Sequence, residues 1–349
     1  KVIEYVEANL RYPKSSGLLK TSDKQSECDS SNASRSPVVS EVSDKMSYDF
    51  DCDAETVPGW KDPVGGSEPG FGSSGFAIPG CDNGRILALI HAKGNMLYGT
   101  GDNRGAARAF EDAVLIAAGR KYDTIQGLVN DILKVVSSNL HHPYEQHARV
   151  MSSEPILLTP EQALATAKLC FPFFGELPGL QHVLGGPQST PRKAVISTTS
   201  NSLLSLAKIF QDGMSNTSRA AGVTPLACGV RDILALYYLS LSLQPSPSTA
   251  NNVGILLASV QQVAPQAQVS RKLNVPGVVP GSGVALALQY YNYGLQLDQH
   301  HAHLYTNLGS LLKDIGQLDA AISMYERAVK CDGKFDIALA NLANAVKDK

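Results

Sequence analysis

Two stretches near the C-terminus decide the fold: Leu304–Leu318 reads LYTNLGSLLKDIGQL, and Ala338–Lys349 reads ALANLANAVKDK. When the two are aligned, Tyr305 falls on Leu339 and Gly309 falls on Ala343. The same interval relates five more pairs of apolar or small residues: Leu308 with Leu342, Leu312 with Val346, Ala287 with Ala321, Tyr291 with Tyr325, and Gly294 with Ala328. This agreement indicates an internal repeat with a period of about 34 residues.

Each repeat unit contains two helices. At about 100° per residue, the first helix places its apolar residues on one stripe, with Gly309 at the point where another helix must come close. The chain turns at Gly316, and Ala321, Tyr325 and Ala328 then form the matching stripe of a second helix. Neither helix can bury its stripe alone, so the units must stack on one another to be stable.

A stacked pair of antiparallel helices that recurs at this interval is typical of the tetratricopeptide repeat (TPR). We therefore predict an all-α fold, a TPR superhelical solenoid with a disordered N-terminal tail and loop insertions. The residues expected to pack the repeats are Gly94, Ala106, Phe110, Ala113, Tyr291, Gly309, Ala321, Tyr325 and Ala328.

Three regions follow from the composition and the pattern. Residues 1–84 are rich in Ser, Gly and Pro and predict a largely disordered tail. Residues 85–245 predict degenerate helical repeats, with a helix ending at Gly213 and with the helix pairing across 115–230 left open. Residues 246–349 predict TPRs that carry an inserted loop at about 261–283. The final stripe has no second helix to cover it, so we expect a fragment truncated at its C-terminus.

Asparagines recur at one position of the first helices. Asn307 and Asn341 are separated by the repeat interval, each nearly opposite the packing stripe, and Asn252 occupies the same slot in an earlier helix. Side-chain amides on the inner wall of a superhelix can hydrogen-bond the main chain of an extended peptide. The alternative is that asparagines are merely tolerated on a solvated face.

The remaining composition argues against several classes of site. A net charge of −2 gives no reason to expect a nucleic acid or a membrane as partner, and no apolar run is long enough for a membrane span. The histidines and scattered cysteines lack metal-ligand spacing, so no metal site is expected. There is no nucleophile elbow, P-loop or zinc-hydrolase motif, and we expect no catalytic residue and no cofactor in this stretch.

The two stretches quoted first, together with Ala320–Val329 (AAISMYERAV), resemble the repeats of protein O-GlcNAc transferases, particularly fungal forms with degenerate upstream repeats. The resemblance implies a glycosyltransferase of the nucleus and cytoplasm that moves N-acetylglucosamine from UDP-GlcNAc to Ser and Thr hydroxyls. It also implies that the repeats select protein substrates through an asparagine ladder, onto which Asn307, Asn341 and, less securely, Asn252 map. The catalytic lobes of that family follow its repeats, so no catalytic residue is carried over.

A non-enzymatic TPR scaffold or co-repressor-type adaptor is the rival interpretation, because repeats of this kind resemble one another across families. In both interpretations the partners are proteins, either extended polypeptide substrates or adaptors. A homodimer is left open by the sequence.

Overall fold

The computed structural model describes residues 70–71, 77–78, 83–119, 121–140, 154–172, 177–183, 189–216, 228–260 and 278–349. Most of the tail predicted at 1–84 and most of the loop predicted at about 261–283 lie outside these residues. Two short strands of the tail region, β1 (Gly70–Phe71) and β2 (Ala77–Ile78), pair in antiparallel fashion. All the other regular elements in the described part of the chain are helices, which confirms the all-α prediction.

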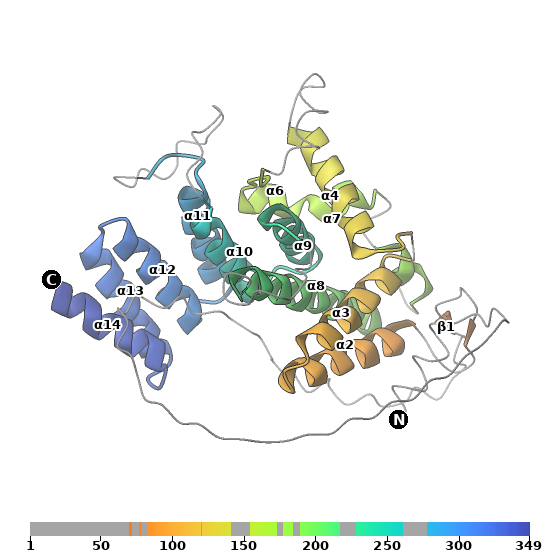
Figure 1. Cartoon of the computed structure of the whole chain (residues 1–349), viewed down its shortest axis with the longest axis horizontal. Helices are drawn as coiled ribbons and strands as arrows, with labels where there is room; N and C mark the ends of the chain where they lie inside the picture. Colours follow the sequence, from red (N-terminus) through yellow and green to blue (C-terminus); the bar gives the residue numbers. More distant parts are fainter. Residues whose placement is uncertain are drawn as a thin grey trace, which may run out of the picture.

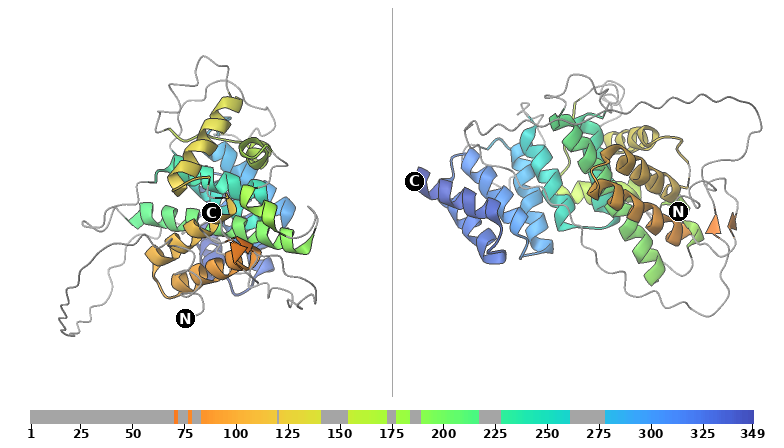
Figure 2. Two further views of the ribbon diagram at one scale, coloured as in Figure 1. Left: turned by 90° about the vertical axis from the view of Figure 1, so that its right-hand side faces the viewer. Right: turned by 60° about the horizontal axis from the view of Figure 1, so that its bottom comes forward.

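Four helical hairpins and one further helix stack in chain order (Figures 1 and 2). The hairpins are α2 (Asn83–Gly99) with α3 (Asn103–Ala117), α8 (Thr190–Asn216) with α9 (Val230–Leu243), α10 (Pro247–Ser259) with α11 (Gly283–Leu297), and α12 (Ala302–Asp314) with α13 (Leu318–Cys331), followed by α14 (Asp336–Asp348). The first helix of each hairpin contacts both helices of the hairpin before it. This is the stacking expected of a TPR solenoid.

The turns inside the first and last hairpins are built alike. Gly101 and Gly316 both have positive φ, 84° and 79°, which is a conformation that glycine adopts without strain. In each turn the next residue donates its N–H to a carbonyl of the helix just ended, Asp102 to Leu97 and Gln317 to Leu312, at 2.9 and 2.8 Å. The glycines therefore end the first helices and reverse the chain.

A glycine packed against an aromatic ring recurs in three hairpins. A Cβ atom built on Gly94 would lie 2.5 Å from the Phe110 ring, and one built on Gly309 would lie 2.7 Å from the Tyr325 ring. Gly254, which is followed by a long insertion, makes the same contact with Tyr291 at 2.4 Å. The three rings are fully buried, so the close approach of the two helices is what encloses them.

An extra layer lies between the first two hairpins in the sequence. It contains α4 (Ile125–Leu140), α6 (Pro160–Leu164), α7 (Thr166–Cys170) and the short 3₁₀ helix η1 (Pro178–His182). Helices α4, α6 and α7 all contact α9, so α9 lies between α8 and this layer (Figure 1). The insertion is therefore packed against the stack.

One predicted helix end is wrong. Gly213 does not end α8, which runs on to Asn216. Apart from the adjacent residues and the backbone of α8 itself, no atom lies within 4 Å of the position where a Cβ of Gly213 would be, and its φ is not positive. The glycine is simply part of an exposed helical turn, because the packing of α8 along its length outweighs the weak helix propensity of one residue.

Candidate functional site: the faces of the repeat stack

The asparagines expected to line an inner wall are buried inside the stack. Asn307 and Asn252 have no exposed surface, and Asn341 is 3% exposed. Asn307 Nδ2 donates to Asn251 Oδ1 at 2.8 Å, and Asn341 Nδ2 donates to Ser310 Oγ at 3.4 Å. The expectation that these amides face a bound peptide is therefore not met by this arrangement.

The reason lies in how the first helices pack. On the side of α12 opposite its apolar stripe, Asn307 bonds Asn251 of α10, and Ser310 bonds Asn341 of α14. Asn307 and Asn341 do lie opposite the stripes, as the spacing indicates, but neighbouring helices cover that face. The amides join consecutive first helices to each other.

Hydrogen bonds of this kind recur along the stack. His91 Nδ1 and Ser202 Oγ join α2 to α8 at 2.9 Å. Between α8 and α10 the link runs through α9, where Ser240 Oγ lies 3.4 Å from Thr249 Oγ1 and donates to the Ser200 carbonyl at 2.9 Å. The Asn251–Asn307 and Ser310–Asn341 bonds continue the series, which we call the polar joints. Sequence reasoning missed Asn251; the adjacent asparagine pair at 251–252 was the available signal.

The His91 joint fixes the protonation state of its ring. The Ser202 hydroxyl donates to the Thr198 carbonyl at 2.8 Å, so His91 Nδ1 must be the donor to Ser202 Oγ. His91 Nε2 is then left to accept from Asn95 Nδ2 at 3.2 Å. Burial lowers the pKa of His91 from 6.5 to about 4, which keeps the ring neutral near pH 7.

The second helices α9 and α11 hold a non-helical segment of the chain itself. We call residues 154–159, which run into α6, the strap. Tyr238 of α9 donates to the Ile156 carbonyl at 3.0 Å and accepts from the Leu158 N–H at 3.3 Å. Tyr290 of α11 donates to the Leu158 carbonyl at 3.1 Å. The second helices of two neighbouring hairpins, α9 and α11, therefore hold the main chain of one segment.

Both tyrosines are fully enclosed where they bind the strap. Tyr238 and Tyr290 stack with ring centroids 6.5 Å apart, and burial raises the pKa of each hydroxyl. They therefore remain protonated donors throughout the neutral range. This is the chemistry of peptide main-chain recognition, and here a segment of the same chain occupies it.

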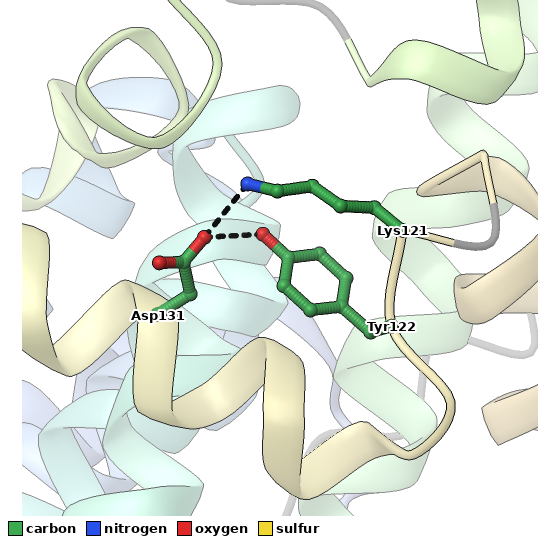
Figure 3. A network of polar contacts seen from close by, with 3 residues as sticks. All are labelled: Lys121, Tyr122 and Asp131. Carbon is green, nitrogen blue, oxygen red and sulfur yellow. Dashed lines mark hydrogen bonds and ion pairs between the residues drawn. The ribbon is translucent and has the colours of Figure 1, made fainter.

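A polar cluster lies at the start of α4. Asp131 accepts hydrogen bonds from Lys121 Nζ, at 2.9 Å, and from the Tyr122 hydroxyl (Figure 3). Burial alone would raise the pKa of Asp131, but the bonds from Tyr122 and Lys121 outweigh it and lower the pKa. An open hollow of about 370 Å³ begins beside Asp131 and is lined also by Lys134, Val135, Ser138 and Leu169. It lacks the enclosure that small-molecule sites usually have.

Two cysteines of the described residues, Cys170 and Cys228, have thiols that are not activated. Burial raises the pKa of Cys170 to about 12 and that of Cys228 to about 11, so neither thiol is activated as a nucleophile. Within the described ranges no three His, Cys, Asp or Glu side chains gather closely enough to hold a metal ion. None of the described helices combines the length and the apolar character needed to cross a bilayer.

The apolar stripe of α14 is only partly covered in the part of the chain that the structure describes: Leu342 packs against α13, and the other stripe residues are exposed. Leu339 is 39% exposed and Val346 is 56% exposed, whereas Tyr305 and Leu308 on the equivalent stripe of α12 are 9% and 5% exposed. Ala343, which corresponds to Gly309, is exposed as well. We call Leu339, Leu342, Ala343 and Val346 the α14 stripe.

Comparison with known proteins identifies one segment directly. The family model of the tetratricopeptide repeat matches residues 302–335. None of the curated proteins compared with this chain matches it. Among solved structures, the crystal structure of a thermophilic TPR protein from Thermus thermophilus aligns with 75% of this chain and 99% of its own, at 14% identity and a TM-score of 0.30. Residues 302–335, which span α12 and α13, thus match a tetratricopeptide repeat, and the helical hairpins before them stack on one another as TPR hairpins do.

Proposed function

We propose that this chain is a protein-binding TPR scaffold. The observation that carries the proposal is the stack itself: a TPR segment at 302–335, with helical hairpins of the same Gly–aromatic packing before it. Such stacks present extended surfaces that suit polypeptides.

As a finer proposal, the scaffold is the substrate-selecting arm of a protein O-GlcNAc transferase of the nucleus and cytoplasm. The support is the resemblance of Leu304–Lys349 to the repeats of that family. In this proposal UDP-GlcNAc is the donor substrate of catalytic lobes outside this chain, and the chain contributes protein recognition alone.

The burial of the asparagines favours the rival, a non-enzymatic scaffold. An asparagine ladder must offer its amides to a peptide, whereas Asn307 and Asn341 use theirs inside the stack. A scaffold that binds its partners through other residues has no need of exposed amides at these positions.

An assay of the complete protein with labelled UDP-GlcNAc and a mixed protein extract distinguishes the transferase proposal from the non-enzymatic scaffold proposal. The transferase proposal expects label on Ser and Thr of extract proteins. It also expects that deletion of residues 83–349 abolishes this transfer while hydrolysis of the sugar nucleotide continues. No transfer by the complete protein would leave the scaffold proposal in place.

The scaffold proposal has its own test. The folded chain, immobilised through residue 1, should retain a defined set of proteins from the same extract. The same chain, unfolded in urea and still unfolded when the urea has been removed, should not retain them. Retention of the same set by both would contradict recognition by the folded stack.

A further inference from the structure

The three hydrogen bonds that join Tyr238 and Tyr290 to the strap all go to main-chain atoms. Tyr238 bonds the Ile156 carbonyl and the Leu158 N–H, and Tyr290 bonds the Leu158 carbonyl. Main-chain groups are the same in every polypeptide, so these contacts do not depend on the side chains of the strap. A different segment with the same backbone shape has the groups to make all three.

Tyr238 contacts the strap as a neighbouring β-strand would. In an extended chain, the carbonyl of one residue and the N–H of the residue two positions later point to the same side, and a neighbouring strand bonds such groups. The Tyr238 hydroxyl, which is both donor and acceptor, bonds one such pair. Residues 155–159 contain no turn or bend, and Thr159 is extended, with φ −71° and ψ 161°. The tyrosines therefore bind a nearly straight stretch of chain.

Only one side chain of the strap is enclosed. Leu158 is 2% exposed, whereas Ile156 and Leu157 are half-buried and Glu154 is exposed. The enclosed part of the strap is thus one leucine side chain and the main chain beside it. This is the pattern of peptide recognition in which main-chain bonds supply affinity and one pocket supplies specificity.

Replacement of the strap costs less than its release. The side chains of Tyr238 and Tyr290 are 2% and 0% exposed, and release would leave their hydroxyls without these main-chain partners. A second segment that takes the place of the strap restores the same bonds. Exchange of one segment for another therefore avoids the cost that opening alone incurs.

We propose that Tyr238 and Tyr290 form a binding site for a non-helical segment of a partner protein, and that the strap is an internal occupant which such a segment displaces. The inference rests on the proposed protein-binding function and names where one partner binds. The partner segment carries a leucine or a similar aliphatic residue in the place of Leu158. Prolines at its ends, such as Pro155 and Pro160 at the strap, favour the extended backbone that the site requires.

The strap has an advantage over any partner segment because it belongs to the same chain. Its effective concentration at the site is high, so a free segment with the same contacts binds the parent chain only weakly. Weakening the strap raises the fraction of chains with an accessible site and strengthens the binding of the free segment. The strap is thus an autoinhibitory contact that only a better-fitting segment overcomes.

The test uses a labelled peptide of residues 153–160 as the probe, with its fluorescence anisotropy followed during titration with the 349-residue chain. The variant Leu158→Ala in the chain removes the enclosed side chain of the strap, and we expect it to bind the unchanged peptide at least about tenfold more tightly than the parent does. Leu157→Ala, at the half-buried neighbouring residue, is the matched control and should bind like the parent. Circular dichroism checks that both variants keep the helices of the parent.

Two modified peptides test the main-chain contacts. N-methylation of the peptide at Leu158 removes the N–H that Tyr238 accepts and leaves every side chain in place, so binding to the Leu158→Ala chain should weaken by about tenfold. N-methylation at Leu157, whose N–H takes no part in these three bonds, should leave the affinity as it is in the unmodified peptide.

Hydrogen exchange in the parent chain follows the displacement itself and needs no variant to fold. Excess unlabelled peptide should speed exchange of the chain's own Leu158 amide and leave the amides of α12 unchanged. No binding of the peptide to the Leu158→Ala chain, equal binding of the two N-methylated peptides, or binding without faster exchange at Leu158 would overturn the proposal. If the folded chain still retains proteins from the extract in such a case, the scaffold function stands and only this site is wrong.

Discussion

At the scale of single residues, a glycine beneath an aromatic ring is the contact that the stack reuses. Gly94, Gly254 and Gly309 each lie where a side chain would collide with the ring of the second helix. Gly213 of α8, by contrast, has open space where a side chain would lie. Replacing a glycine by alanine should therefore change the stability of the chain in opposite directions at different positions.

We expect Gly309→Ala to destabilise the chain and Gly213→Ala to stabilise it. Overpacking against Tyr325 costs about 1–3 kcal/mol, which exceeds the gain of about 1 kcal/mol that Ala brings to a helix interior. Gly213→Ala should show the gain alone. Urea unfolding followed by circular dichroism measures both, and an equal shift of the midpoint in the two variants would contradict the packing argument.

The buried His91 should make stability depend on pH. Its pKa is about 4 in the folded chain and near 6.5 when exposed, so below pH 6.5 the unfolded chain binds more protons than the folded one. The stability contribution of neutral His91 is complete above pH 6.5 and is lost between about pH 6.5 and pH 4.

The slope from this one residue is at most about 1.4 kcal/mol per pH unit. His91→Gln keeps a side-chain amide but cannot titrate, so the stability difference between parent and variant should narrow or reverse as the pH falls from 7 to 4. Parallel curves of unfolding free energy against pH would show that His91 does not titrate on unfolding.

Residue spacing shows which face of a helix is apolar, but it does not show what meets the other face. The stripe residues Leu308 and Gly309 could be found because positions three and four apart share a face. The partner of Asn307 could not, since Asn251 is 56 positions away and the contact depends on how α10 crosses α12. An amide that looks solvated in the sequence is buried for that reason.

At the scale of elements, the strap connects the second helices α9 and α11, which are separated in the sequence by α10. A capping box marks where the strap ends: Gln162 accepts from the Thr159 N–H, and Thr159 accepts from the Gln162 N–H. The strap before it has no periodic pattern. Its position is set by Tyr238 and Tyr290, which bind main chain, so no side-chain signal marks it.

Removing the Tyr238 hydroxyl should loosen the strap. Tyr238→Phe leaves the Leu158 N–H and the Ile156 carbonyl without these bonds, at a cost of about 1–3 kcal/mol for the buried groups. Tyr290→Phe removes a single bond and should cost less. Tyr293→Phe, at a partly exposed tyrosine of α11, serves as the control and should leave stability unchanged.

Hydrogen exchange reports the strap directly. Leu158 lies outside any helix, so slow exchange of its amide in the parent chain would come from the bond to Tyr238. We expect that protection to disappear in Tyr238→Phe and to persist in Tyr293→Phe. Fast exchange at Leu158 in the parent would show that the strap is not held.

At the scale of the whole molecule, each hairpin contacts chiefly its neighbours, so local stability should follow position in the stack. Helix α12 has helices on both sides, whereas α14 has described neighbours only on one. Amide exchange should therefore be slower in α12 than in α14. The difference between their opening free energies should correspond to the interface that α14 lacks among the described residues. Equal protection in the two would indicate a single cooperative unit.

The polar joints bear on how a repetitive chain avoids assembling in the wrong order. Hairpins with interchangeable apolar stripes could stack on a neighbour that is one unit too far along, and such mispairing is a characteristic failure of repeat proteins. The joints differ from one another: a histidine meets a serine, two asparagines meet, and a serine meets an asparagine. A hairpin in the wrong place would bury these polar groups without hydrogen-bond partners. The cost of burying them in this way disfavours the wrong neighbour, so the polar joints contribute to the correct order of the hairpins.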